Sequence, residues 1–322
     1  MNYGSDAAES QLTCALYYKD KAEEMETADV ANDGWNSRQE FSKLSKSIDM
    51  IGMPFGDIFN QNRYLINNVN MKLRLLRHNP EFCLMAKAAA AAEGEQAQLQ
   101  SYKIHIEQAT LFVHKVKISP SSILSHAAIM QQNTPVKYPI RRVEMKTFSL
   151  STGDMGANRD NIVLGQMPTR VVLGLVSGAA MNGNLTKNPF NFQNFNLNYL
   201  SLFIDSEQIP ATPLTPDFTS NQYIREYQTL FDALDIWRGD RGIQISRKDY
   251  PNGYTLYAFD LTPTQSASGN SACFNLLRQG NLRLMMKFAA PLAETINVIM
   301  HLTYENMLEV DSMRNVVYDF ST

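Results

Sequence analysis

The chain has few cysteines and no long apolar run, and each lack excludes a class of protein. Its three cysteines, Cys14, Cys83 and Cys273, are isolated and form no CxxC pair. A disulfide framework or a structural zinc site is therefore not expected, and a reducing compartment fits best. No apolar stretch approaches the roughly 20 residues needed to cross a bilayer. The first residues, MNYGSDAAES, lack the basic and apolar segments of a signal peptide, so we expect an intracellular protein.

The chain also lacks a large excess of either positive or negative charge. The chain carries 29 Lys and Arg residues against 32 Asp and Glu residues, a formal net charge of −3 at pH 7. Because phosphate-driven binding needs a basic face, sequence-specific nucleic-acid recognition is not expected. Lys72, Arg74, Arg77 and His78 form one local basic cluster, which is better explained as a solvated strand end than as a phosphate site.

Familiar catalytic signatures are also missing. The sequence contains no GxGxxG, GxSxG, HExxH or EF-hand pattern. Its nearest approach to a phosphate-binding loop runs from Gly178 to Gly183, but Asn184 and Leu185 stand where Lys and Ser or Thr are required. We therefore predict no catalytic residue, no cofactor site and no enzymatic activity.

Two sets of residues resemble metal ligands only weakly. His105 and His114 fall in neighbouring predicted strands, yet two histidines without a third ligand are more often packing residues. Asp235, Asp240 and Asp249 lie near a turn-rich stretch. Their spacing fits no calcium loop, and solvated turn carboxylates explain them better. We predict no metal site.

The stretch between Asn161 and Pro210 carries the strongest signal of regular structure. Two apolar runs, Val171 to Val176 and Leu197 to Ile204, flank a turn-rich segment loaded with Gly and Asn. Neither run has helical spacing, and both are rich in the β-branched and large apolar residues of strands. The second run is apolar on both faces. It predicts a strand covered by a second sheet on one side and by another domain or subunit on the other.

Further alternation of apolar and polar residues predicts an antiparallel β-sandwich beyond residue 100. Strands without helical crossovers between them pair antiparallel, and roughly eight of them suit a two-sheet jelly roll. Besides the two runs above, the predicted strands are Tyr102 to Ile106, Leu111 to Ile118, Arg142 to Thr147, Tyr254 to Leu261, Leu282 to Phe288, Ile296 to Tyr304 and Val316 to Tyr318.

Two helices are expected in loops of this sandwich. Ser119-Pro120 opens the first, with an N-cap hydroxyl followed by Pro at N1. The expected inward stripe of this helix consists of Ile123, Leu124 and Ala127. The second helix is predicted over Ser220 to Trp237, where apolar residues recur at helical spacing. A helix between sandwich strands lies at an edge or an end, so we expect it at the outer or inter-subunit surface.

Residues 1–86 contain too few strand-like runs for a sandwich of their own. These runs are Ile48 to Ile51, Tyr64 to Ile66 and Met71 to Leu75. An alanine run from Ala88 to Ala92, followed by EGEQAQ, has helix-forming residues but no apolar stripe. We interpret residues 87–99 as an Ala-rich linker or loop, and therefore as the domain boundary.

Several stretches resemble one family of proteins. They are VVLGLV at Val171, NPFNFQNFNLNYLSLFID at Asn188, YPNGYTLYAFDLTP at Tyr250 and ENMLEVDSMRNVVYDF at Glu305. They resemble the major capsid protein of Polinton (Maverick) elements and the related adintoviruses. Shorter stretches agree, FNQNRYLINNVNMKLRLLRH at Phe59 and KYPIRRVEMKTFSLSTG at Lys137 among them. The resemblance covers nearly the whole chain in collinear order.

The resemblance implies a double jelly roll of the adenovirus-hexon lineage, in which three chains form a pseudo-hexagonal capsomer of an icosahedral shell. Residues 1–86 would be the C-terminal remnant of a first jelly roll, and residues 100–322 a complete second one. Members of the family have extra residues on the N-terminal side. The resemblance therefore implies that this chain is a fragment, a truncated gene model or a decayed transposon copy. The implied location is the virion, with neighbouring capsomers and penton or minor capsid proteins as partners.

Two other functions compete with that of a structural, homotrimeric capsid subunit. The aromatic and Asn-rich loop from Asn188 to Asn196 suggests a jelly-roll module that binds a glycan or a receptor. A jelly-roll metal enzyme using His105 and His114 is the third hypothesis. We rank the capsid subunit first, the binding module second and the enzyme last.

Overall fold

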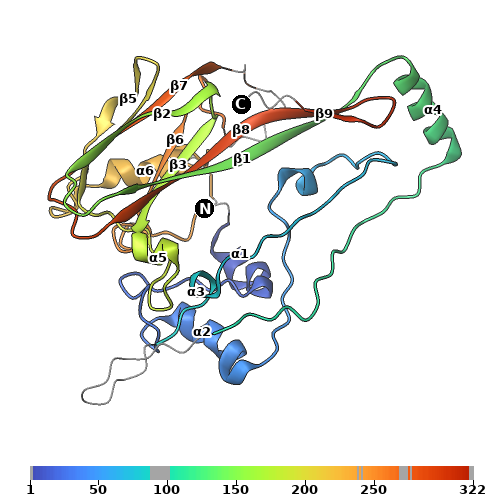
Figure 1. Cartoon of the computed structure of the whole chain (residues 1–322). Coiled ribbons are helices and arrows are strands. Elements are labelled where there is room, and N and C mark those ends of the chain that lie inside the picture. The colour runs from blue at the N-terminus through green and yellow to red at the C-terminus, as the bar shows by residue number, and fades with distance from the viewer. Residues whose placement is uncertain are drawn as a thin grey trace.

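An antiparallel β-sandwich lies in the upper part of the view, and much of the chain that precedes it lies below (Figure 1). The computed structural model describes residues 3–87, 102–237, 239–240, 242–267, 275 and 278–318. The strands are β1 (Val136–Leu150), β2 (Gly156–Gln166), β3 (Arg170–Ser177), β4 (Leu197–Ile204), β5 (Glu207–Leu214), β6 (Leu256–Asp260), β7 (Gln279–Phe288), β8 (Ile296–Val310) and β9 (Val316–Tyr318).

The order of the strands identifies the sandwich as a jelly roll. One sheet has the order β1-β8-β3-β6, with β9 beside β8, and the other has the order β2-β7-β4-β5. All pairs are antiparallel. From β1 to β8 the chain changes sheet at every step except between β4 and β5, which are neighbours. The predicted antiparallel jelly-roll sandwich is therefore confirmed.

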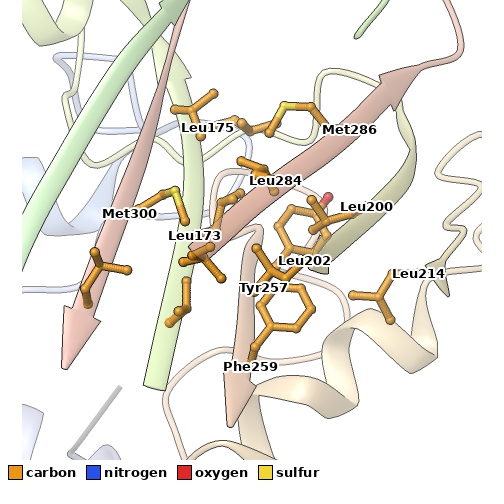
Figure 2. Close-up of a cluster of buried hydrophobic side chains, with 14 of the residues drawn as sticks. Leu173, Leu175, Leu200, Leu202, Leu214, Tyr257, Phe259, Leu284, Met286 and Met300 are labelled. Atoms are coloured by element: carbon orange, nitrogen blue, oxygen red, sulfur yellow. The ribbon is translucent and has the colours of Figure 1, made fainter. Parts of the chain in front are cut away.

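Apolar side chains that point between the sheets hold the sandwich together. Leu173 of β3 and Met300 of β8 belong to the same buried cluster as Leu202 of β4 and Leu284 of β7 (Figure 2). All four side chains are completely buried. Because side chains alternate between the faces of a strand, one face of each sheet builds this core. The predicted place of β4 in the inner part of the sandwich is confirmed.

A helix covers the outer face of the first sheet beside β6. This helix, α6 (Ile224–Asp232), packs its buried Leu230 with Ala258 of β6 in a second apolar cluster, which Tyr250 completes. The helix therefore lies outside the sandwich, as predicted. It is shorter than the predicted helix from Ser220 to Trp237.

The other helices are short. The α-helices are α1 (Ser5–Glu9), α2 (Asp33–Ser42), α3 (Pro80–Cys83), α4 (Pro120–Gln131) and α5 (Gly178–Asn182), and the 3-10 helices are η1 (Gln11–Ala15), η2 (Lys43–Ser45) and η3 (Asp57–Asn60). Among the helices that the structure describes, none has the length and hydrophobicity of a membrane span.

Five predicted strands are wrong. Residues 48–51, 64–66, 71–75, 102–106 and 111–118 lie in irregular segments that belong to neither sheet. Strand structure depends on a neighbour that satisfies the main-chain N–H and C=O groups. Val136–Val310 supplies all eight strands of the jelly roll, and the five segments have no partner strand in the described part of the chain. Apolar alternation alone did not distinguish a strand from an extended segment without a partner.

Two strands were not predicted, and both lie at the edges of the second sheet. β2 contains a polar run and a register shift between Arg159 and Val163, and β5 contains Pro210 and Pro213. An edge strand tolerates Pro and polar residues because one side of its main chain needs no partner. Those residues hid the alternation on which the prediction depended.

The helix opened by Ser119-Pro120 is present, but its expected inward stripe is wrong. The Ser119 hydroxyl accepts a hydrogen bond from the Ser122 N–H, as an N-cap does. Ile123 and Leu124 are 48% and 71% exposed. α4 lies at the far end of the long ribbon made by β1 and β8, away from the sandwich (Figure 1). A stripe needs a packing surface, and the sandwich does not reach this far.

The second sheet offers a test of the core. We expect Leu284→Ala to lower the free energy of unfolding by about 2–5 kcal/mol, because it leaves a cavity between the sheets. Leu164→Ala is the matched control, since Leu164 is in the same sheet but 61% exposed, and it should change stability little. Chemical denaturation of both variants measures the difference. Equal losses would contradict this account of the core.

Candidate functional site

The residues that resemble metal ligands do not assemble into a reactive centre. His105 and His114 are exposed on irregular segments instead of lying in paired strands. Within the residues that the structure describes, no three His, Cys, Asp or Glu side chains gather as a metal site would require. Asp235 and Asp240 are exposed, whereas Asp249 pairs with a lysine far away in the sequence. The arrangement gives the metal-enzyme hypothesis no support.

The two anion-site candidates are accounted for by local structure. Residues from Gly178 onward form the five-residue helix α5, and the Gly178 N–H already donates to the carbonyl of Thr295 at 2.8 Å. In the basic cluster, Arg77 donates to the carbonyl of Ile104 at 2.5 Å, and Lys72 and Arg74 are exposed. These positions agree with solvated charges.

The Asn-rich loop before β4 directs its amides toward its own chain. Three of its asparagines donate side-chain hydrogen bonds of 2.9–3.1 Å to groups of other segments. The donors are Asn188, Asn191 and Asn194, and the acceptors are the carboxylates of Asp20 and Glu26 and the carbonyls of Met25 and Pro251. These amide donors are therefore engaged within the chain, which weakens the hypothesis of a glycan-binding loop.

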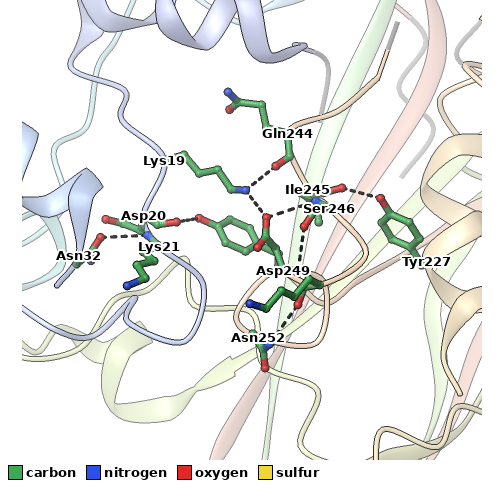
Figure 3. Close-up of polar contacts among 12 residues, drawn as sticks. Lys19, Asp20, Lys21, Asn32, Tyr227, Gln244, Ile245, Ser246, Asp249 and Asn252 are labelled. Atoms are coloured by element: carbon green, nitrogen blue, oxygen red, sulfur yellow. Dashed lines mark hydrogen bonds and ion pairs between the residues drawn. The ribbon is translucent and has the colours of Figure 1, made fainter. Parts of the chain in front are cut away.

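The partner of this loop is an N-terminal segment that we call the arm, residues 17–38. Lys19 is its central contact. The Lys19 ammonium lies 2.6 Å from the Asp249 carboxylate and 2.6 Å from the carbonyl of Gln244, and it sits 5.0 Å from the ring centre of Tyr254 (Figure 3). The side chains of the Lys19–Asp249 pair are 27% and 24% exposed. Partial burial makes such an ion pair stronger than one in free solvent.

Asp20, next to Lys19 in the sequence, contacts both the jelly roll and the arm itself. Its carbonyl accepts a hydrogen bond from the Tyr254 hydroxyl at 2.5 Å, and its carboxylate pairs with Arg38 at 2.5 Å. Arg38 also donates to the carbonyl of Tyr18. The arm is thus folded on itself and attached to the jelly roll by neighbouring residues.

Two further contacts lie at the bend of the arm. Glu26 pairs with Lys187 at 2.8 Å, and Met25 is only 3% exposed. The Met25 side chain packs on Gly253, which has φ +104° and has no space for a Cβ beside the sulfur. Glycine is needed here both for the left-handed backbone and for the close approach.

The pKa values of the jelly-roll groups that contact the arm are shifted. Burial raises the pKa of the Tyr254 hydroxyl, and the nearby Asp20 charge adds to the effect. The hydrogen bond to Glu26 raises the pKa of Lys187. For Asp249, burial favours a higher pKa, but hydrogen bonds from Lys19 and Ser246 outweigh it and lower the pKa. The charged forms of the Lys187 ammonium and the Asp249 carboxylate are thus the favoured ones.

A second N-terminal segment covers one end of the free edge of β1. The Arg141 N–H donates to Asp57 at 2.8 Å, while Gln61 and Arg63 donate to the carbonyls of Pro139 and Lys137 at 2.7 and 2.8 Å. Side chains here satisfy main-chain groups that a neighbouring strand would otherwise pair. Such covering protects an edge strand from unwanted association.

Apolar side chains are exposed along residues 41–76 and 102–129, which we call the uncovered segments. Leu75 and Leu76 are 79% and 78% exposed, and Phe112 is 78% exposed. The other large apolar residues exposed there are Phe41, Leu44, Met50, Ile51, Met53, Phe55, Tyr64, Met71, Leu73, Tyr102, Ile106, Leu111, Val113, Val116, Ile123, Leu124 and Ile129. Exposed apolar residues in this number make the uncovered segments a candidate interaction surface.

Within this chain, cations of a neighbouring strand cover the outer face of β4. Tyr199 and Phe203 point away from the core and are half-buried. Their cover within this chain comes from cations of the neighbouring strand β7: Lys287 lies 5.4 Å from the Tyr199 ring, and Arg283 lies 4.2 Å from the Phe203 ring. Cation–π stacking is thus the cover within this chain, and cover of this face by another domain or subunit stays a prediction.

Comparisons with known proteins find likenesses but no family model that matches. An uncharacterized protein of Caenorhabditis elegans is 25% identical over 327 residues, which cover 98% of this chain and 72% of that protein. Among solved structures, a chain of the Sputnik virophage structure aligns with a TM-score of 0.38 at 12% identity over 57% of this chain. A chain of the PBCV-1 virus capsid gives 0.35 at 11% over 62%, and the mavirus major capsid protein gives 0.30 at 9% over 57%. The aligned part spans 39%, 55% and 41% of those three chains.

Sequence reasoning missed the arm entirely. Glu26 and Asp20 anchor the arm to the jelly-roll loops. Lys19 and Asp249 are 230 positions apart, and no local pattern predicts such a pairing. The one indication in the sequence was the concentration of amides between Asn188 and Asn196, which indicated a polar contact surface but not its partner.

Removing the ammonium of Lys19 should loosen the arm. We expect Lys19→Met to cost about 1–2 kcal/mol, between a surface ion pair and a buried one, and to speed proteolytic cleavage within residues 17–38. Lys21→Met is the matched control, because the Lys21 side chain is exposed. Limited proteolysis followed by mass spectrometry measures the rates. The same rate in both variants would show that Lys19 does not hold the arm.

Acid should release the arm as well. A carboxyl whose pKa is lower in the folded state stabilises that state above its ordinary pKa of about 3.9, and the contribution is lost as the pH falls further. Asp249 has such a lowered pKa, so protection of the arm in hydrogen exchange should decline below about pH 4. Asp249→Asn should have weaker protection at neutral pH and a smaller decline. An unchanged pH profile in this variant would exclude Asp249 as the cause.

Proposed function

We propose that this chain is a structural subunit of a virion shell, a major capsid protein that associates as a homotrimer. The observation that carries the proposal is that one chain combines a complete jelly-roll core with the uncovered segments. The core needs no partner, whereas the exposed leucines and aromatics of residues 41–76 and 102–129 do. Jelly rolls are the architecture of many viral capsid subunits.

The resemblance of the sequence to Polinton (Maverick) and adintovirus capsid proteins supports the lineage. In this proposal residues 1–86 are the remnant of a first jelly roll, residues 87–99 are a linker, and the second jelly roll lies within residues 100–322. Of the uncovered segments, residues 41–76 then belong to the remnant of the first sandwich, and residues 102–129 precede the strands of the second. Neighbouring capsomers and penton or minor capsid proteins are the partners, and the virion is the final location.

Self-association is the testable core of the proposal. We expect the full chain to form a discrete trimer in light scattering coupled to size exclusion, with the uncovered segments at its contacts. Leu75→Asp with Leu76→Asp should give monomers, because both side chains are exposed in the single chain and charge at a buried apolar contact is costly.

The control for charge places aspartate in the same segment without removing apolar surface. Lys72→Asp with Arg74→Asp should keep the trimer. A wild-type chain that stays monomeric at high concentration would refute the proposed assembly. A trimer that persists in the leucine variant would place its contacts elsewhere.

A further inference from the structure

We propose that the free edge of β1 pairs with β1 of a second copy, antiparallel and across a two-fold axis at Met145. The surface is the main chain of residues 142–148, and the partner is the same segment of the other copy. This contact is distinct from the trimer proposed above and does not depend on it. It extends the sheet β1-β8-β3-β6 of one copy into the same sheet of the other.

The first observation is a window of free main-chain groups. The N–H of Arg141 and the carbonyls of Lys137 and Pro139 point away from β8, because side chains of the chain bond to them there. Strand geometry alternates and β1 has no register shift, so Val143 and Met145 direct their groups to the same open side.

At each end of the window, a side chain bonds to the outward main-chain groups. Thr147 continues the open row, and at Ser149 the carbonyl accepts a hydrogen bond from Arg159 at 3.4 Å. Among the residues that the structure describes, none bonds to the outward groups of Val143, Met145 and Thr147. The row is therefore covered at Arg141 and at Ser149, and Met145 is its midpoint.

The second observation is that the sequence of the window is complementary to itself about Met145. In a two-fold pairing at that residue, Glu144 faces Lys146 of the second copy, and Lys146 faces Glu144 of the second copy. Opposite charges at facing positions of an antiparallel pair are favourable. The same register sets Val143 against Thr147 of the second copy, so no directly facing positions carry like charges.

The side chains beside the window leave it accessible. Val143 and Met145 are 50% and 55% exposed, and Thr147 is also exposed. Asp57 covers Arg141 at one end and Arg159 covers Ser149 at the other. Because Arg141 faces Ser149 of the second copy in this register, Asp57 approaches an Arg159 of opposite charge at each end.

The occupant is a second copy because the two-fold axis satisfies both edges at once. An isologous contact pairs each group with the same patch on its partner and closes without further growth. Edge pairing over so few residues buries less than the about 800 Å² per partner that is typical of stable interfaces. The dimer is therefore weak in dilute solution, and a covalent trap is the suitable probe.

Disulfide trapping tests the register. In a chain whose Cys14, Cys83 and Cys273 are replaced by Ser, Met145→Cys should oxidise to a covalent dimer, because facing residues have Cα atoms about 5.5 Å apart. Val143→Cys alone should not, since its two copies lie four residues apart, about 13 Å. A mixture of Val143→Cys and Thr147→Cys chains should crosslink to each other. Met145→Cys dimers that form no faster than those of either single control would overturn the proposal.

Charge reversal tests the pairing independently of the cysteines' reactivity. In the Met145→Cys chain, Glu144→Lys should slow crosslinking, because the introduced ammonium of each copy then faces the Lys146 ammonium of the other. Glu144→Lys combined with Lys146→Glu should restore the rate, since facing charges are opposite again. Circular dichroism confirms that each variant is folded. An unchanged rate with Glu144→Lys, or no recovery in the double variant, would refute the two-fold contact.

Discussion

The burial of apolar side chains between the two sheets is the constraint on which the rest of the structure depends. Leu173 and Met300 from one sheet pack in one cluster with Leu202 and Leu284 from the other, and water is excluded from all four. This contact fixes the register of β3, β4, β7 and β8, because a shift by one residue would turn each apolar face outward. The segments outside the sandwich are attached to strands whose register this core has fixed.

The attachments follow from what the sandwich leaves unsatisfied. At one end of the free edge of β1, the main chain is covered by Asp57, Gln61 and Arg63. The polar loops near Tyr254 are covered by the arm through Lys19 and Asp20. These contacts are polar and partly exposed, so they are weaker than the core and open at lower cost. The molecule therefore combines an apolar sandwich core with segments that are held to it by weaker polar contacts.

The sequence was informative where the signal is local and weak where it depends on distant partners. β4 and β9 were predicted with their observed bounds because apolar runs and flanking turn residues define them. The segments near Met71 and Phe112 carry clear strand-like patterns too, and nothing in the local pattern showed that they have no neighbouring strand. The edge strand β2 was not predicted, because its polar run hides the alternation and its pairing with β7 joins residues far apart in the sequence.

The two kinds of open surface differ in what each can contribute to the proposed association. The uncovered segments present leucines and aromatics such as Leu75 and Phe112, whose burial is favourable in proportion to area and without regard to direction. The window around Met145 presents main-chain groups, whose satisfaction depends strictly on register. The first kind can supply affinity and the second orientation. In the proposed assembly, a chain with both kinds of surface joins copies of itself in a fixed geometry, which is the physical requirement for a closed shell.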